Sequence, residues 1–371
     1  MSHFKQLAVL IVLIGLFSAC AVPSTPSIPT MPQPTETTAP ATVPAAIAAS
    51  PTPTIGGALR VLCSPQEDWC KLLTETFERQ TGIKTSFVRM SQGEALAHLR
   101  ATKDAPDFDV WFGGPVDGWV LAGEEGLIES YVSPNASAIA DALKDPNGLW
   151  TGVYAGTLGF CSNPDVLAQL GVNVPDEWQD LLDPKLQGKI GMAHPATSGT
   201  AFTIFWTQAT LNKLDMDSTF AYFEKLNSSI LRYTKSGSES GKMAGEGEIA
   251  VAIIFSHACI KYKKEGYPNL VLSFPREGTG YEIGGVGIIA GNANPQAARL
   301  WVDWTLLPKT QDLALEVNAL QLPTNPYALI SDASMDLLQI NLVDYDFVAA
   351  AAQKSDITQR FIEQIAPAPS E

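Results

Sequence analysis

The chain has 371 residues, with 24 lysines and arginines against 39 aspartates and glutamates, so its formal net charge at neutral pH is −15. Such an acidic balance argues against binding to nucleic acid or to an anionic lipid surface. It does not exclude a small anionic ligand, because backbone amides and helix termini can hold an anion locally.

Residues 1–20 have the pattern of an export signal. Lys5 precedes an apolar stretch, residues 7–17, that is short for a span across a bilayer. Small residues and Cys20 follow directly. The segment resembles a bacterial lipoprotein signal peptide, which predicts that Cys20 is lipidated, for example with palmitate, and anchors the protein to the cell membrane. An ordinary signal peptide with an incidental cysteine is the alternative.

Residues 21–56 are rich in Pro, Thr, Ser and Ala and hold almost no charged or aromatic residue. Such a composition cannot bury enough apolar surface to fold, and frequent proline keeps a chain extended. We therefore expect a disordered tether between the lipid and a folded part. The remainder, residues 57–371, is long enough for two domains and holds no apolar run long enough to span a membrane.

Four cysteines lie in this remainder, an even number that fits disulfide bonding in an exported protein. Cys63 and Cys70 are close in sequence, which favours a local bridge and leaves Cys161 with Cys259. Four cysteines allow three pairings, so the sequence does not choose among them. The spacings are not those of a zinc ribbon and histidine is scarce, so we expect no metal site.

The first part of the folded region alternates strands and helices. Strands are predicted over residues 57–63, 83–90 and 108–114, with helices over 67–81 and from Glu94 onward. A β-α-β-α-β order implies a mostly parallel sheet with helices on both faces.

Two long extended stretches, near residues 152 and 282, flank a second α/β set. The chain is therefore predicted to leave the first domain and return to it, with two crossing strands that form a hinge. Lobe 1 would comprise residues 57–152 and 282–371, and lobe 2 residues 153–281, with a cleft between them. The end of the chain is predicted to be helical at residues 294–317, 335–340 and 358–365.

Six segments resemble segments of extracellular solute-binding proteins of ABC importers and occur in the same order. They are TGIKTSFVRMSQGEALAHLRA, DFDVWFGGPVDGW, KIGMAHPATSGTAF, YTKSGSESGKMAGEGEIAVAIIF, FPREGTGYEIGGVGIIAG and NPQAARLWVDWTL. The branch that the chain resembles includes binders of ferric iron, phosphonates, sugar phosphates, thiamine and polyamines. The resemblance implies an α/β type II periplasmic binding protein fold, an ABC permease as partner, a location outside the cytoplasm and no cofactor. We also expect a monomer.

The same resemblance implies which residues face the ligand. They follow strands in both lobes, and two weaker candidates lie at a later turn and at the return crossing. The predicted ligand-binding residues are Ser91, Gln92, Gly93, Gly113, Gly114, Thr197, Ser198, Gly199, Thr200, Ser236 and Glu282.

The turn from Thr197 to Thr200 combines hydroxyl groups, a glycine and a helix start, which suits a phosphate, phosphonate or carboxylate group. A simple N-cap explains Ser198 but not the whole cluster. The turn that begins at Ser91 has the same form, so two such turns could clamp one anion; a capping turn is its alternative. Possible counter-charges are Arg89, Arg276 and Lys242.

Ferric-iron binders of this branch carry two neighbouring tyrosines where this chain has SHACIKY, residues 256–262. Because that pair is absent, an organic anion is favoured, with an organophosphonate or a sugar phosphate first. Iron, thiamine or a polyamine is the alternative, and a sensor role in place of import stays open. A secreted hydrolase is a distant alternative, because no nucleophile elbow, zinc-protease or P-loop motif is present.

Overall fold

The computed structural model describes residues 57–369. The predicted signal peptide with Cys20 and the tether over residues 21–56 lie outside the described residues. The described residues belong to one compact unit. Within the described part of the chain, no helix has both the length and the apolar character needed to cross a membrane.

The first lobe has the predicted β-α-β-α-β order around a parallel sheet. Strand β1 pairs in parallel with β2 and with β3. Helix α1 occupies the predicted residues and ends at Gly82, whose φ of 76° suits a residue without a Cβ. The elements are β1 (Ala58–Cys63), α1 (Glu67–Thr81), β2 (Lys84–Arg89), α2 (Gln92–Ala101), β3 (Val110–Pro115), α3 (Val116–Glu124) and β4 (Ile128–Glu129), followed by 3-10 turns at Pro134–Ala138 and Asp141–Leu143.

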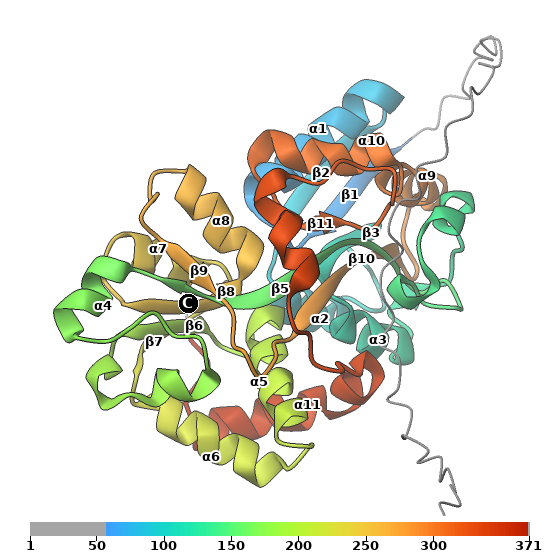
Figure 1. The fold of residues 1–371 in the computed structure, drawn as a ribbon. Helices are drawn as coiled ribbons and strands as arrows, with labels where there is room; N and C mark the ends of the chain where they lie inside the picture. The colour runs from blue at the N-terminus through green and yellow to red at the C-terminus, as the bar shows by residue number, and fades with distance from the viewer. Residues whose placement is uncertain (1–56, 370–371) are drawn as a thin grey trace, which may run out of the picture. The chain divides into compact units, whose positions relative to one another are not determined.

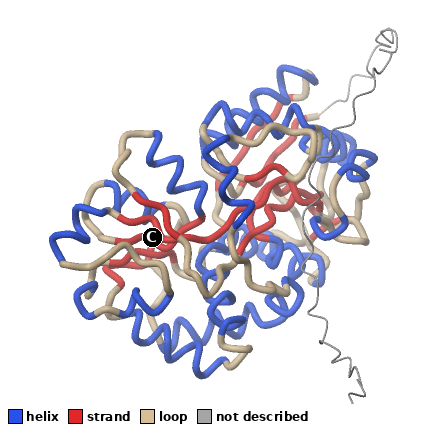
Figure 2. The backbone as a smooth tube through the Cα atoms, viewed as in Figure 1, coloured by secondary structure: helices blue, strands red, loops and turns tan. Residues whose placement is uncertain are grey.

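Strand β5 (Thr151–Ser162) carries the chain from the first sheet into the second (Figure 1). Its first half pairs antiparallel with β10 (Tyr281–Ile289), which in turn pairs antiparallel with β3. Its second half pairs antiparallel with β8 (Val251–Phe255) and β9 (Val271–Ser273) of the second sheet. The hydrogen-bonded strands therefore form one continuous series from the first lobe into the second (Figure 2). The predicted two-lobed α/β fold with crossing strands is confirmed.

The second lobe also has parallel strands, with β6 between β7 and β8. Its core is aromatic and includes Phe202, Phe205 and Phe223, all of them buried. The elements are α4 (Pro164–Leu170), 3-10 turns at Trp178–Leu182 and Pro184–Leu186, β6 (Ile190–Ala193), α5 (Gly199–Leu211), α6 (Met216–Asn227), β7 (Ile230–Thr234), α7 (Glu239–Gly245), β8 (Val251–Phe255), α8 (Ser256–Lys264) and β9 (Val271–Ser273).

The C-terminal segment differs from its prediction. Helix α11 is much longer than the predicted 358–365 and does not belong to lobe 1 alone, since Ile357 and Phe361 pack in the core of lobe 2. The exact lobe boundaries stay a prediction. The elements after β10 are α9 (Pro295–Thr305), α10 (Pro308–Gln311), a 3-10 turn at Asp312–Val317, β11 (Leu322–Pro323), a 3-10 turn at Asp332–Gln339 and α11 (Phe347–Gln364).

Two disulfides form, one in each lobe. Cys63 bonds to Cys70 and joins the end of β1 to the first turn of α1. Cys161 bonds to Cys259 and joins β5 to α8. The first is the pair that proximity in the sequence favoured, and the second is the pair that it left over.

A buried ion pair connects α11 to the first lobe. Lys354 Nζ lies 3.3 Å from Asp117 Oδ1 on α3, and the two side chains are 6% and 0% exposed. Asp117 also accepts hydrogen bonds from Gln92 Nε2 at 3.0 Å and from the Tyr345 hydroxyl at 3.2 Å. Burial lowers the pKa of the Lys354 ammonium group, and the Asp117 carboxylate opposes that shift.

We expect Lys354→Met to lower the free energy of unfolding by about 3–5 kcal/mol, because Asp117 would remain buried without its cation. Urea denaturation at neutral pH measures the change. The double variant Lys354→Met with Asp117→Asn is expected to recover much of the loss. The exposed pair of Lys84 with Glu78 supplies a control, and Lys84→Met is expected to change stability far less. Equal losses in the two single variants would contradict this account.

Candidate functional site

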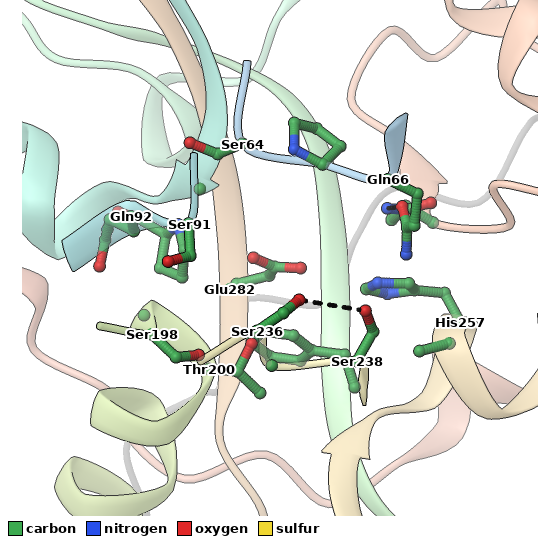
Figure 3. A pocket seen from close by; sticks show the side chains of 18 of the residues that line it. Ser64, Gln66, Ser91, Gln92, Ser198, Thr200, Ser236, Ser238, His257 and Glu282 are labelled. Carbon is green, nitrogen blue, oxygen red and sulfur yellow. Dashed lines mark hydrogen bonds between the residues drawn. The ribbon is translucent and has the colours of Figure 1, made fainter. Parts of the chain in front are cut away.

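A pocket lies between the two lobes, lined by side chains from both (Figure 3). Its cavity volume is about 60 Å³, which is room for several waters. Eight of the eleven predicted ligand-binding residues line it: Ser91, Gln92, Gly114, Ser198, Gly199, Thr200, Ser236 and Glu282.

The first residues of six helices converge on this pocket. Helices follow strands, so in each sheet they begin at the carboxyl ends of the parallel strands, and both of these edges face the pocket. A helix N-terminus has unpaired N–H groups and a partial positive charge, so the convergence favours an anion. The N-cap residues that line the pocket are Gln66 of α1, Ser91 of α2, Pro115 of α3, Ser198 of α5, Ser238 of α7 and Phe255 of α8.

Helix α5 presents donors to the pocket. Its N-cap Ser198 satisfies one first-turn N–H group through its side-chain oxygen. The first N–H groups of a helix have no acceptor within that helix. The N–H groups of Gly199 and Thr200 can therefore donate hydrogen bonds to a ligand. Gly199 also permits a close approach, because an added Cβ would lie 2.5 Å from Gln92 Oε1. These three residues form the part of the predicted anion cradle that reaches the pocket.

Thr197 joins the two lobes instead of lining the pocket. Its carbonyl oxygen accepts hydrogen bonds from Ser91 Oγ at 2.6 Å and from the Gly93 N–H group at 2.9 Å. Arg89 Nη2 donates to Ser236 Oγ at 2.9 Å and forms a third bond between the lobes. The structure is therefore a closed arrangement. Thr197 and Gly93, predicted to face the ligand, close the cleft beside it.

Arg89 is the cation of the pocket. It is the single lysine or arginine among the described residues that line it. Its Nε donates to the Pro65 carbonyl oxygen at 3.1 Å, which holds the guanidinium group at the pocket wall. Arg276 and Lys242, the other predicted counter-charges, form ion pairs with acidic side chains outside the pocket.

Glu282 and His257 add two buried titratable groups to the pocket. Burial raises the pKa of the Glu282 carboxyl group well above its usual value, and the negative charge of Asp117 adds to the shift. Burial lowers the pKa of His257 to about 3, with a further contribution from Lys261. His257 is therefore neutral at physiological pH, so Arg89 and the helix termini supply the positive potential.

Gln92 and Gly113 were predicted to contact the ligand, but in the structure both contact other residues of the protein. The Gln92 amide donates to the Pro115 carbonyl oxygen and to Asp117, and its Oε1 accepts from Lys354. Its polar group is thus committed to a buried network behind the pocket. Gly113 does not line the pocket; a Cβ there would lie 2.5 Å from the Pro65 ring.

Several lining residues were missed in the sequence. Ser64 and Gln66 follow β1 as Ser91 follows β2, so the same strand-to-helix signal could have found them. His257 lies in SHACIKY, the segment that we compared only with the tyrosine pair of ferric-iron binders. The sequence around Tyr154 and Gln321 does not predict that they line the pocket, because the crossing strand and the return segment bring them there. The other residues that sequence reasoning missed are Pro65, Pro115, Phe255 and Ala258.

The chain matches a known family over most of its folded part. Residues 73–336 match the model of the bacterial extracellular solute-binding protein family. An uncharacterized protein of Haemophilus influenzae is 36% identical over 329 residues, which cover 86% of this chain and 94% of that protein.

Two further relatives have names that state a ligand. The periplasmic binding protein AfuA from Actinobacillus pleuropneumoniae, solved with exogenous fructose-6-phosphate bound, is 39% identical with a TM-score of 0.80, over 83% of this chain and 98% of that chain. A candidate 2-aminoethylphosphonate-binding periplasmic protein of Salmonella typhimurium is 30% identical over 186 residues, 50% of this chain and 52% of that protein.

Gly93→Ala is expected to hinder closure of the lobes. A Cβ at this position would lie 2.3 Å from the Ala196 carbonyl oxygen of the other lobe, which is backbone and cannot move aside freely. Alanine suits a helix, so the free energy of unfolding should change by less than about 1 kcal/mol. Small-angle scattering should show a larger radius of gyration than for the wild type.

Gly123→Ala is the matched control, because its methyl group would meet the flexible end of Leu149 in the same lobe. We expect this control to scatter like the wild type. An unchanged radius of gyration in Gly93→Ala would show that closure tolerates the added methyl group.

Proposed function

The chain belongs to the bacterial extracellular solute-binding proteins, and from that premise we propose that its pocket captures a small anionic solute, with an organophosphonate or a sugar phosphate favoured. As a member of this family it is a substrate-binding protein of an ABC importer, acts outside the cytoplasm and is not an enzyme. Its partners are a small solute and an ABC permease. In our proposal, closure of the lobes over the solute presents the complex to that permease.

The convergence of six helix N-termini on one pocket carries this proposal. Oriented N–H groups and hydroxyl donors bind an anion without requiring many cations, which suits a chain as acidic as this one. Arg89 adds one full positive charge at the same wall. A phosphoryl or phosphono group, with three oxygens that each accept hydrogen bonds, matches such a set of donors. The ligands named for the two relatives, fructose-6-phosphate and 2-aminoethylphosphonate, are both of this kind.

The alternative ligands fit the donor set less well. Ferric iron prefers several phenolate and carboxylate oxygens, whereas the described lining residues include one tyrosine, Tyr154, and one carboxylate, Glu282. No group of three or more His, Cys, Asp or Glu side chains in residues 57–369 is arranged for a metal ion. A polyamine would require more carboxylates than the pocket provides.

We expect Ser198→Ala combined with Thr200→Val to weaken binding of a phosphorylated solute by about 10-fold or more, because hydroxyl groups at the cradle would be lost. Calorimetric titration of the full-length chain with fructose 6-phosphate, 2-aminoethylphosphonate and inorganic phosphate measures the affinities. Thermal unfolding with the same compounds gives an independent readout, because a ligand of the folded state raises the melting temperature.

Ser218→Ala is a control of the same chemistry in the first turn of α6, where Ser218 bonds Asp215 at the surface. This control should bind like the wild type. If none of the phosphorylated compounds binds the wild type, or if the double variant binds them unchanged, the anion cradle is refuted.

We also propose that the protein is a lipoprotein, anchored to the outer face of the cell membrane through Cys20, and that it is a monomer. An acyl chain gives membrane affinity of ~0.8 kcal/mol per buried methylene group. Cys20→Ser should therefore release the protein from the membrane fraction and abolish its labelling by a palmitate analogue in cells. Labelling that persists in Cys20→Ser would contradict the anchor.

A further inference from the structure

A charged contact joins the two lobes beside the pocket. Lys261 on α8 forms an ion pair with Asp68 on α1, and its ammonium group also donates a hydrogen bond to the Val317 carbonyl oxygen at 2.8 Å. Figure 3 shows Gln66 and His257 facing each other at one wall of the pocket. Asp68 and Lys261 follow these two residues in the same helices, and neither is among the described residues that line the pocket.

The two sides of this contact belong to different lobes. Helix α1 packs in the core of the first lobe through Trp69, and Val317 packs against the same core. Helix α8 packs against β8 of the second sheet through Ala258. A rotation that parts the lobes therefore separates Lys261 from both of its acceptors in the first lobe at once.

A disulfide fixes each side of the contact to its own lobe. The bond from Cys70, two residues after Asp68, ties α1 to the end of β1. The bond from Cys259, two residues before Lys261, ties α8 to β5. Because the backbone on each side is held covalently, a movement of one lobe relative to the other changes the distance between the ammonium and carboxylate groups directly.

The closed arrangement shields the ammonium group from water. The Lys261 side chain is 11% exposed, and that of Asp68 is 43% exposed. The neighbouring residue on α8, Ile260, is buried against Leu320 and Leu322 from the return segment. A hydrogen bond from a charged donor is stronger in such a shielded position than at the open surface.

Both charged groups also have a partner within their own lobe. Lys261 Nζ lies 3.1 Å from Glu265 Oε1, one turn further along α8. Asp68 Oδ1 accepts a hydrogen bond from the Trp69 N–H group at 2.9 Å, at the start of α1. Parting of the lobes therefore leaves neither charge buried and unpaired, so the contact can break and form again as the cleft opens and closes.

We propose that Lys261, Asp68 and the Val317 carbonyl oxygen form a latch that stabilises the closed arrangement of the lobes. Lys261 is a positioning residue: it increases the closed population without touching the solute, so it raises the affinity for different solutes by the same factor. The inference rests on the proposed function in one respect, that the lobes close over a solute. Its effect on the lobes themselves does not depend on which solute binds.

Hydrogen–deuterium exchange of the full-length chain without added solute tests the effect on the lobes. The Gly93 N–H group donates across the cleft to the Thr197 carbonyl oxygen, so its exchange rate reports how often the lobes part. Lys261→Met keeps an unbranched side chain but removes the charge. We expect the Gly93 amide to exchange at least about 3-fold faster in this variant than in the wild type.

Calorimetric titration with fructose 6-phosphate and 2-aminoethylphosphonate tests the effect on affinity. Lys261→Met should weaken the binding of each compound that the wild type binds by about 5- to 20-fold, chiefly through faster dissociation. Asp68→Asn keeps an oxygen for the Trp69 N–H group and should weaken binding by about 3-fold. The double variant should bind as Lys261→Met does, because Asp68 acts on closure through Lys261.

Two further variants separate the latch from a general effect of substitution. Lys264→Met removes the same charge from an exposed position on the same helix and should match the wild type in exchange and in affinity. Lys261→Arg keeps the positive charge and should retain most of the affinity that Lys261→Met loses. Thermal unfolding of the ligand-free variants shows whether each of them is folded.

The latch is overturned if the Gly93 amide in Lys261→Met exchanges within about 2-fold of the wild-type rate, or if the losses in the double variant are additive. Unchanged affinity in Lys261→Met would also overturn it, and would leave the anion cradle intact. If neither compound binds the wild type while exchange at Gly93 is faster in Lys261→Met, the latch stands and the proposed choice of solute fails.

Discussion

The continuity of strand β5 through both sheets is the constraint on which the pocket depends. Antiparallel pairing with β10 holds one half of β5 in the first sheet, and pairing with β8 and β9 holds the other half in the second. The parallel strands of the two lobes then end at edges that face each other, and the helices that follow them begin at the same place. The crossing strands β5 and β10, together with the later passage of the chain into α11 on lobe 2, leave rotation of the lobes as the motion that opens and closes the cleft.

An acidic protein can hold an anion because its positive potential is local. Charges on the surface are screened over about 10 Å by salt, whereas helix N-termini and Arg89 act at contact distance inside a closed pocket. The same pocket contains a buried carboxyl group at Glu282 and a neutral ring at His257.

The C-terminal helix is part of this machinery although it lies beyond residues 73–336, where the family model matches. Its apolar side chains complete the core of lobe 2, while Lys354 neutralises Asp117 and fixes the amide of Gln92 on lobe 1. The network keeps the negative charge of Asp117 from acting unopposed behind the anion cradle. It also places a buried polar contact between elements of different lobes, so its geometry belongs to the closed arrangement.

Local patterns in the sequence determined the α/β class, helix α1, the helix start at Ser198 and the polar turn at Ser91, because periodicity and capping depend on neighbouring residues. The two crossings also followed from local pattern, since long extended stretches flanked a complete α/β set. Tertiary structure alone decided which polar groups meet. Lys354 reaches Gln92 across 262 residues of sequence, Gln321 enters the pocket from the return segment, and α11 docks on lobe 2. Such contacts arise from packing between distant elements, and no short-range periodicity or spacing encodes them.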